Sequence, residues 1–439
     1  MDIIIAGAGR VGFKLAKTLS IKHNITIIDK NKDALERLGE SIDVMSIYGN
    51  IEDPDTFKNL KDKNYDIFIA VTDNDEANIL STLIAGDIIE VDQKIIRLRN
   101  PYFAKSSIAK KLNINEAVFP FVSAARSIKS LLDFPKANNV KDFIFTPFKL
   151  ISVQVKKSGL IKVDEILSKK VVVVGIEREK RFFIPNKDEN IEENDLIYIF
   201  GDESNIKEIC NKLNKEAPKE IKKVAIFGAK LLGIEIAKAF LEKNIQIKII
   251  DKDPNLCQKA AEILQDKVMI INSKYIEHTI YEEENIKNAD MVIATSNEDE
   301  DNIIRCLEAK EYNVKKTVAV NNNIEFYSLM HKLGIIAVRG PKTSAYYSIL
   351  EKIASSSVIT EKHFCGGRGT VVMRKIFPNS KLIGKSLKPF KLEDMVSFYI
   401  RNNEIREFKD KIVLKENDII LLFLKNYIEE KAKKWIFGL

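Results

Sequence analysis

The sequence predicts an α/β chain built from two doubly wound parallel-sheet lobes, each followed by a small β-rich α+β module. Three observations carry this prediction. Short apolar runs alternate with helical stretches, a glycine turn follows the first run of each series, and the whole series occurs twice along the chain. Alternation of strands with helices is typical of parallel sheets covered on both faces, and self-similarity at a long period indicates a duplicated unit.

The first lobe is expected over residues 1–134. Its apolar runs are short, rich in Ile and Val, and separated by helical stretches, which is the pattern of buried parallel strands. The expected strands cover residues 2–6, 25–29, 44–49, 66–71, 94–98 and 116–120.

The periodicity changes after residue 134, and a small module is expected over 135–215. Its apolar runs favour an antiparallel sheet, with one short helix predicted at 162–170. The expected strands cover residues 148–155, 171–177, 181–186 and 195–201. The lysine-rich stretch 211–223 contains a proline and is predicted to link this module to the second half.

The chain repeats itself with a period of about 220 residues. Gly7 and Gly228 lie 221 residues apart, and Asp29 and Asp251, each ending the next apolar run, lie 222 apart. "AVTDNDEANIL" (70–80) also returns as "IATSNEDEDNII" (293–304). The second parallel-sheet lobe is therefore expected over 216–358 and the second small module over 359–439. The segment 363–370, "HFCGGRGT", is predicted to be a flexible connection between them.

Composition narrows the functional classes. The 439 residues carry 70 Lys and Arg against 63 Asp and Glu, a mild excess that favours a mixed-charge surface over a nucleic-acid site. The four cysteines are scattered singly, which disfavours a zinc site or a disulfide framework. No run of 18 apolar residues and no leader pattern is present in the sequence, so a cytoplasmic protein is expected.

The turn "GAGRVG" (7–12) predicts a dinucleotide site in a Rossmann-like lobe. Gly7 permits the tight turn, Gly9 lets the backbone approach a pyrophosphate, and Gly12 lets helix and strand pack closely. Asp29 ends the following strand, where its carboxylate can accept hydrogen bonds from an adenosine ribose and would repel a 2′-phosphate. NAD(H) or adenine nucleotides are therefore favoured over NADP.

The second turn, "GAKLLG" (228–233), has Lys230 in place of the middle glycine. Asp251 is retained, so ribose recognition remains possible, and the lysine side chain can pair with a phosphate from the side. Two interpretations stay open: a degenerate turn without a ligand, or a site with altered phosphate contacts.

No catalytic arrangement is apparent, so a protein that is not an enzyme is expected. Two Tyr-x-x-x-Lys pairs occur, Tyr312 with Lys316 and Tyr427 with Lys431, but neither falls where the catalytic helix of a short-chain dehydrogenase belongs. The rival class is an NAD-dependent oxidoreductase with two Rossmann-like lobes, which requires a substrate cleft with a proton donor.

Four stretches resemble a known protein family more specifically than the glycine turn alone does: "GAGRVG", "YGNIEDPDTF" (48–57), "IAVTDNDEANIL" (69–80) and "IRLRNPYF" (96–103). Together with the doubled organisation, the chain resembles the tandem RCK (regulator of potassium conductance) family of Trk potassium-uptake regulatory subunits. The resemblance implies NAD(H) and ATP or ADP as ligands. It also implies a tetrameric gating ring of eight RCK domains, peripheral on the inner face of the membrane, against a TrkH- or TrkG-type pore subunit. An RCK regulator of a different potassium channel or transporter, such as Ktr, remains an alternative.

The resemblance also implies a set of nucleotide contacts in the first lobe. Phosphate contacts are implied at Gly7, Gly9, Arg10, Val11 and Gly12; adenosine contacts at Asp29, Lys30, Asn50 and Ile51; the far wall at Thr72, Asp73 and Asn74; and phosphate sensing at Arg97 and Arg99. Asn50 differs from the aspartate usual in the family. In the second lobe, Asp251 is the residue carried over.

Overall fold

The computed structural model describes residues 1–156, 161–273, 279–354 and 359–438. The chain forms two compact units. The first comprises residues 1–125 with 339–353, and the second comprises 126–338 with 354–439. The four-part division expected from the sequence stays a prediction.

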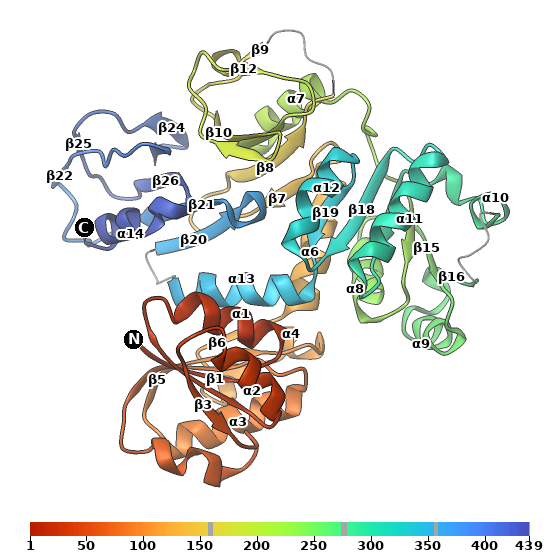
Figure 1. Ribbon diagram of the computed structural model, residues 1–439. Helices are drawn as coiled ribbons and strands as arrows, with labels where there is room; N and C mark the ends of the chain where they lie inside the picture. The colour runs from red at the N-terminus through yellow and green to blue at the C-terminus, as the bar shows by residue number, and fades with distance from the viewer. Residues whose placement is uncertain (157–160, 274–278, 355–358, 439) are drawn as a thin grey trace. The chain divides into compact units, whose positions relative to one another are not determined.

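A six-stranded parallel sheet forms the centre of the first unit (Figure 1). Its order is β3-β2-β1-β4-β5-β6, the doubly wound arrangement in which the chain reverses direction across the sheet after β3. The strands are β1 (Asp2–Ala6), β2 (Asn24–Asp29), β3 (Met45–Tyr48), β4 (Tyr65–Ala70), β5 (Val91–Arg97) and β6 (Glu116–Val118). Residues of β1 alternate between two apolar clusters, one on each face, which confirms a sheet buried on both sides.

Helices cover both faces of this sheet. Before α6 they are α1 (Arg10–Leu19), α2 (Lys32–Gly39), the 3₁₀ helix η1 (Pro54–Leu60), α3 (Asp75–Ile88), α4 (Tyr102–Lys105) and α5 (Ile108–Lys111). Helix α6 (Pro120–Asp133) begins in the first unit and continues into the second. A helix from far along the chain, α13 (Pro341–Ala354), joins the cluster that contains α1 (Figure 1). The Tyr346 and Thr18 hydroxyls are hydrogen-bonded at 2.8 Å, and the Lys14 ammonium lies 4.4 Å from the Tyr346 ring centre.

The second parallel sheet has the same topology, with the order β16-β15-β14-β17-β18-β19. Its strands are β14 (Lys223–Phe227), β15 (Gln246–Asp251), β16 (Met269–Asn272), β17 (Met291–Ala294), β18 (Lys316–Asn321) and β19 (Ile336–Arg339). Its helices are α8 (Leu231–Leu241), α9 (Pro254–Leu264), η3 (Gln265–Lys267), α10 (Ile280–Glu283), η4 (Ile286–Asn288), α11 (Asp299–Glu311), η5 (Ile324–Phe326) and α12 (Tyr327–Lys332). The repeat is thus structural as well as sequential.

The two small modules also match one another. Each has a five-stranded antiparallel sheet, in the orders β11-β10-β13-β8-β7 and β20-β21-β26-β23-β24, and each adds a two-stranded ribbon. The first contains β7 (Asn139–Lys141), β8 (Lys149–Gln154), β9 (Ile161–Lys162), η2 (Val163–Glu165), β10 (Val171–Arg178), β11 (Arg181–Phe183), β12 (Asn190–Ile191), β13 (Leu196–Gly201) and α7 (Glu203–Leu213). The second contains β20 (Ile359–Phe364), η6 (Cys365–Gly367), β21 (Gly369–Lys375), β22 (Ser386–Leu387), β23 (Met395–Arg401), β24 (Glu404–Glu407), β25 (Ile412–Val413), β26 (Ile419–Lys425), η7 (Asn426–Ile428) and α14 (Glu429–Phe437). One apolar cluster is shared by the two five-stranded sheets.

Two local predictions were wrong. The helix expected at 162–170 is only the 3₁₀ turn η2, because a bridge between Ser168 and Val171 already leads the chain into β10. The segment 363–370 is not a flexible connection but the tight end of the β20–β21 hairpin. Its glycines serve that turn: Gly366 and Gly367 have φ of 63° and 91°, conformations that favour glycine.

Within the described part of the chain, no helix is both long enough and apolar enough to cross a membrane.

Candidate functional site

The glycine turn at the start of α1 has the geometry that the sequence predicts. Gly7 has φ of 111°, a conformation open to glycine but not to larger residues. At Gly12, an added Cβ would lie 1.8 Å from the Gly7 carbonyl oxygen, so the helix can approach the turn only without a side chain. Both glycines are therefore required by the fold itself.

Gly9 is different, because the fold does not need it. It has φ of −66° and ψ of −176°, which any residue can adopt, and an added Cβ would meet no atom of the described residues within 4 Å. The open space lies at the N-terminus of α1, where no side chain caps the helix, whereas Asn31 and Asn74 cap α2 and α3. The first-turn N–H groups of α1 are thus available to an anion, and the missing side chain leaves room for it.

Asp29 holds the turn in place. Its carboxylate accepts hydrogen bonds from the backbone N–H of Ala8 at 2.5 Å and of Asn31 at 2.8 Å. An ionised carboxylate has about four lone-pair positions, so Asp29, which is partly exposed, retains acceptor capacity for ribose hydroxyls. Lys30 and Arg10 are exposed beside it.

The loop after β4 forms the opposite wall. Thr72 lies directly against the turn, since a Cβ on Gly7 would come within 3.1 Å of the Thr72 backbone nitrogen. Asp73 and Asn74 follow on the exposed side of this loop.

Asn78 supports this wall and was missed as a functional position. It is fully buried on α3, and its amide oxygen accepts from the Thr72 N–H at 2.9 Å and from the Thr72 hydroxyl at 2.7 Å. Its amide nitrogen donates to the Arg97 carbonyl at 2.9 Å. The signal was present, because Asn302 stands at the matching place in the second copy of this stretch and binds Ser296 and Val320 in the same way.

The two arginines of β5 and its following loop lie at the same edge of the sheet. Arg97 is only 7% exposed and donates weakly to the Thr72 carbonyl at 3.3 Å, and its Nε has no hydrogen-bond partner among the described residues. Burial lowers the pKa of this guanidinium. Arg99 donates to the Asp73 carbonyl at 2.7 Å, and its own N–H is held by Asp75. Arg97 is thus a buried cation without a full set of acceptors, as expected of a group that meets an anion.

Asn50 and Ile51 follow β3 in a loop that begins next to Asp29. The Gly49 N–H donates to the Asp29 carbonyl at 3.1 Å, which holds the start of this loop against the end of β2. The Ile51 side chain is buried in the apolar cluster beneath the sheet, so only its backbone is free to face a ligand. The Asn50 side chain is exposed and accepts from the Glu52 N–H.

The second lobe keeps the backbone of the turn. Gly228 has φ of 119°, and a Cβ on Gly233 would lie 1.9 Å from the Gly228 carbonyl oxygen. Lys230 takes the place of Gly9 with φ of −72° and ψ of 177°, and its side chain does not cap α8. Asp251 accepts from the Ala229 N–H at 2.7 Å but is only 6% exposed.

The second lobe lacks arginines at the positions that match Arg10, Arg97 and Arg99. Strand register aligns Arg97 with Val320, and Asp299 holds the Asn322 N–H as Asp75 holds that of Arg99. Leu231 follows Lys230 where Arg10 follows Gly9. The supporting framework is therefore duplicated, while the three arginines are present only in the first lobe.

In the second Tyr-x-x-x-Lys pattern the Tyr427 hydroxyl donates to Asp394, and in the first the two side chains have separate partners. Tyr312 stacks on Tyr281, with ring centres 4.7 Å apart, whereas the Lys316 ammonium is buried and donates to the carbonyls of Pro135 and Ala137. Among the described residues, no group of three or more His, Cys, Asp or Glu side chains is arranged to hold a metal ion.

Comparison with known proteins gives consistent matches over the whole chain. Residues 3–120 and 224–341 each match the TrkA-N domain, and residues 151–214 match the TrkA-C domain. A Trk system potassium uptake protein TrkA homolog of Archaeoglobus fulgidus is 27% identical over 434 residues, covering 97% of both chains. The Trk system potassium uptake protein TrkA of Halomonas elongata is 25% identical, covering 100% of this chain and 99% of its own.

Solved structures share the fold. The GsuK RCK domain superposes with a TM-score of 0.63 at 16% identity, covering 100% of this chain and 95% of that chain. A GsuK channel bound to NAD gives a TM-score of 0.63 at 17% identity, covering 100% of this chain and 79% of that one.

Proposed function

The chain belongs to the TrkA family of potassium-uptake regulatory subunits, which are not enzymes, and on that premise we propose that it is a nucleotide-sensing gating-ring subunit of a Trk-type system. The ligands proposed are NAD(H) and ATP or ADP. The observation that carries the proposal is the first glycine turn. An uncapped helix N-terminus and open space at Gly9 lie there, near a buried arginine whose Nε has no partner among the residues that the structure describes.

Each group has a proposed role that follows from its position. The N–H groups of Arg10 and Val11 and the Arg10 side chain bind phosphate, and Gly9 gives the phosphate access to the backbone. Asp29 accepts from the ribose, and Arg97 and Arg99 sense phosphate charge. The remaining proposed contacts are Gly7 and Gly12 in the turn, Lys30, Asn50 and Ile51 near the adenosine, Thr72, Asp73 and Asn74 on the opposite wall, and Asp251 in the second lobe.

Relatives support the choice of ligand. One GsuK structure of this fold is bound to NAD, and another GsuK structure, with a TM-score of 0.51 at 15% identity, is bound to ADP. The Asp29 carboxylate would repel a 2′-phosphate, which favours NAD(H) over NADP.

The proposed assembly is a tetramer, a ring of eight RCK units, on the inner face of the membrane against a TrkH- or TrkG-type pore subunit. The names of the relatives support a potassium-uptake partner, and the duplicated chain supplies two such units per subunit. The subunit is proposed to be cytoplasmic and peripheral to the membrane.

Regulation is proposed to be a population shift between ring shapes. A nearly complete switch requires roughly 5.5 kcal/mol of differential binding, which four identical pockets supply at about 1.4 kcal/mol each. In such a ring Arg10, Arg97 and Arg99 discriminate between ligands by the number of phosphate charges they meet.

Calorimetric titration of the full chain with NADH, NAD, ATP and ADP tests the ligand, and co-purification with a Trk-type or a Ktr-type membrane subunit tests the partner. Saturable binding of at least one nucleotide that Gly9→Lys abolishes supports the proposal. Absence of binding by all four nucleotides overturns it, and co-purification with a Ktr-type subunit alone transfers the function to another potassium transporter.

A further inference from the structure

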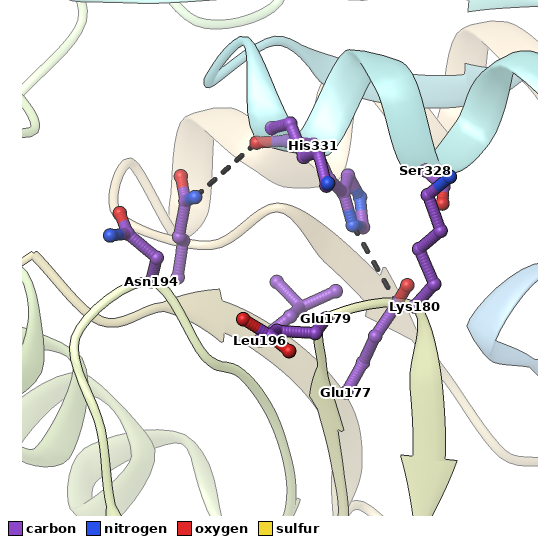
Figure 2. Close-up of a pocket in the computed structure, with 9 residues that line it drawn as sticks. Glu177, Glu179, Lys180, Asn194, Leu196, Ser328 and His331 are labelled. Atoms are coloured by element: carbon purple, nitrogen blue, oxygen red, sulfur yellow. Dashed lines mark hydrogen bonds and ion pairs between the residues drawn. The ribbon is translucent and has the colours of Figure 1, made fainter.

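A cavity of about 250 Å³ lies in the second compact unit, between the first small module and the second parallel-sheet lobe (Figure 2). None of its residues belongs to either glycine turn. It is lined by Gln154, Glu177, Glu179, Lys180, Asn194, Leu196, Ser328, His331 and Lys332.

Glu177 is a buried carboxylate on this wall. It lies on β10 and is 6% exposed, and its Oε1 accepts from Arg368 Nη2 at 2.5 Å. Among the described residues, its Oε2 receives only the weak thiol donor of Cys365, at 3.3 Å, while His331 Nδ1 lies 3.8 Å away, too far for a hydrogen bond. Figure 2 shows this side chain pointing toward the His331 ring. Oε2 therefore has unused acceptor capacity toward the cavity.

The second small module shows that the fold does not require this carboxylate. Strand register aligns Arg178 with Arg401, and both arginines pair with an aspartate at the start of the neighbouring strand. The same register aligns Glu177 with Ile400, a buried apolar residue. An ionisable group thus stands in the first module where its duplicate packs with hydrocarbon.

The turn between β10 and β11 is also unusual. Glu179 and Lys180 have φ of 46° and 73°, and the matching turn of the second module has φ of 54° and 57° at Asn402 and Asn403. Asparagine tolerates such conformations far better than glutamate or lysine. The first module therefore retains two charged side chains on the cavity wall at a conformational cost that its duplicate avoids.

The lining carries charges of both signs. Of its two carboxylates, Glu177 is buried and pairs through Oε1 with Arg368, whereas Glu179 is exposed. Its two ammonium groups, Lys180 and Lys332, are exposed, and burial lowers the pKa of His331. Figure 2 shows Lys180 extending toward Ser328, with Glu179 on the side of Leu196. An occupant with both an ammonium group and a carboxylate can therefore meet groups of both signs in this lining.

We propose that this cavity binds a small zwitterion of the amino-acid class. Its ammonium group meets Glu177 and Glu179, and its carboxylate meets Lys180 and Lys332. Glu177 and Lys180 belong to the first small module, and Ser328, His331 and Lys332 belong to α12 of the second lobe. The ligand therefore bridges two parts of the second unit and is a second effector, distinct from the nucleotide.

The test is thermal unfolding and calorimetry of the full chain with each of the twenty L-amino acids. At least one is expected to raise the unfolding temperature and to bind saturably at one site per chain. Its analogues lacking the amino group or lacking the carboxylate are expected to bind at least tenfold more weakly. Gly9→Lys is expected to remove nucleotide binding and to leave amino-acid binding unchanged. The experiment therefore distinguishes failure of this proposal from failure of the proposed nucleotide site.

The matched variant is Glu179→Asn with Lys180→Asn, which copies the turn of the second module. Because asparagine suits this conformation, the unliganded variant is expected to unfold at the same temperature as the wild type or a higher one. Its affinity for the amino acid is expected to fall at least tenfold. Arg181→Met, next to the turn but outside the cavity lining, serves as the control and is expected to bind normally. Binding by none of the twenty amino acids, or binding that the double variant leaves intact, overturns the proposal.

Discussion

Lys230 has the backbone conformation of Gly9, with φ and ψ of −72° and 177° against −66° and −176°. The two turns therefore present their helix N-termini in the same way, and the difference between them is in side chains. The first lobe has Arg10, Arg97 and Arg99 around an open approach, whereas the second has one lysine on the approach itself. The second turn is thus structurally intact rather than collapsed.

Exchange of these two residues tests which turn binds nucleotide. Gly9→Lys is expected to weaken nucleotide binding by at least 100-fold without lowering the unfolding temperature, because an added Cβ has no neighbour within 4 Å in the part of the chain that the structure describes. Lys230→Gly is expected to add no site of comparable affinity, since the second lobe lacks the matching arginines. Calorimetric stoichiometry and affinity measure both outcomes. Half the binding surviving in Gly9→Lys would instead identify Lys230 as a phosphate ligand.

Substitutions at two glycines of the first turn are predicted to differ in their effect on stability. Gly12→Ala places a Cβ 1.8 Å from the Gly7 carbonyl oxygen and is expected to lower the free energy of unfolding by about 3 kcal/mol. Gly9→Ala is expected to change it by less than about 0.5 kcal/mol, in line with other substitutions away from packed sites. Urea unfolding followed by circular dichroism compares the two. Equal losses would show that Gly9 is also held by the fold.

Asn78 and Asn302 form a matched pair of supports. Truncation of either to alanine strands buried backbone groups and is expected to lower the free energy of unfolding by about 2–3 kcal/mol. Only Asn78→Ala is expected to weaken nucleotide binding, because it frees Thr72 and the Arg97 carbonyl beside the first turn. Denaturation and calorimetry on both variants separate these effects, and equal losses of affinity would contradict a site in the first lobe alone.

The burial of Lys316 predicts that the stability of the chain depends on pH. Burial lowers its pKa from 10.5 to about 7, so above pH 7 the unfolded chain binds a proton that the folded chain does not. The free energy of unfolding therefore gains a contribution that rises with pH between about 7 and 10.5, at up to about 1.4 kcal/mol per pH unit.

Lys316→Met is expected to remove this slope. The difference in unfolding free energy between wild type and variant is measured from pH 7 to 8.5. Both chains carry the same cysteines, so thiol ionisation in the unfolded chain cancels in this difference. Lys315→Met, at an exposed neighbouring position, is expected to keep the slope. If the difference in unfolding free energy stays constant with pH, burial does not lower the pKa of Lys316.

The sequence by itself determined the duplication, both parallel sheets and the turn at Gly7. Apolar runs, a glycine-dependent turn and a fixed repeat distance are local properties, and local backbone chemistry decides them. Only the tertiary structure showed which atoms meet: that a Cβ on Gly12 would clash with the Gly7 carbonyl oxygen, that Asn78 holds the wall of the site, and that Glu177 and His331, 154 residues apart, line one cavity. These depend on which side chains meet across elements distant along the chain. Strand pairing and helix packing set those distances. The repeat spacing therefore marks Asn78 and Asn302 as matching positions but does not show what either side chain contacts.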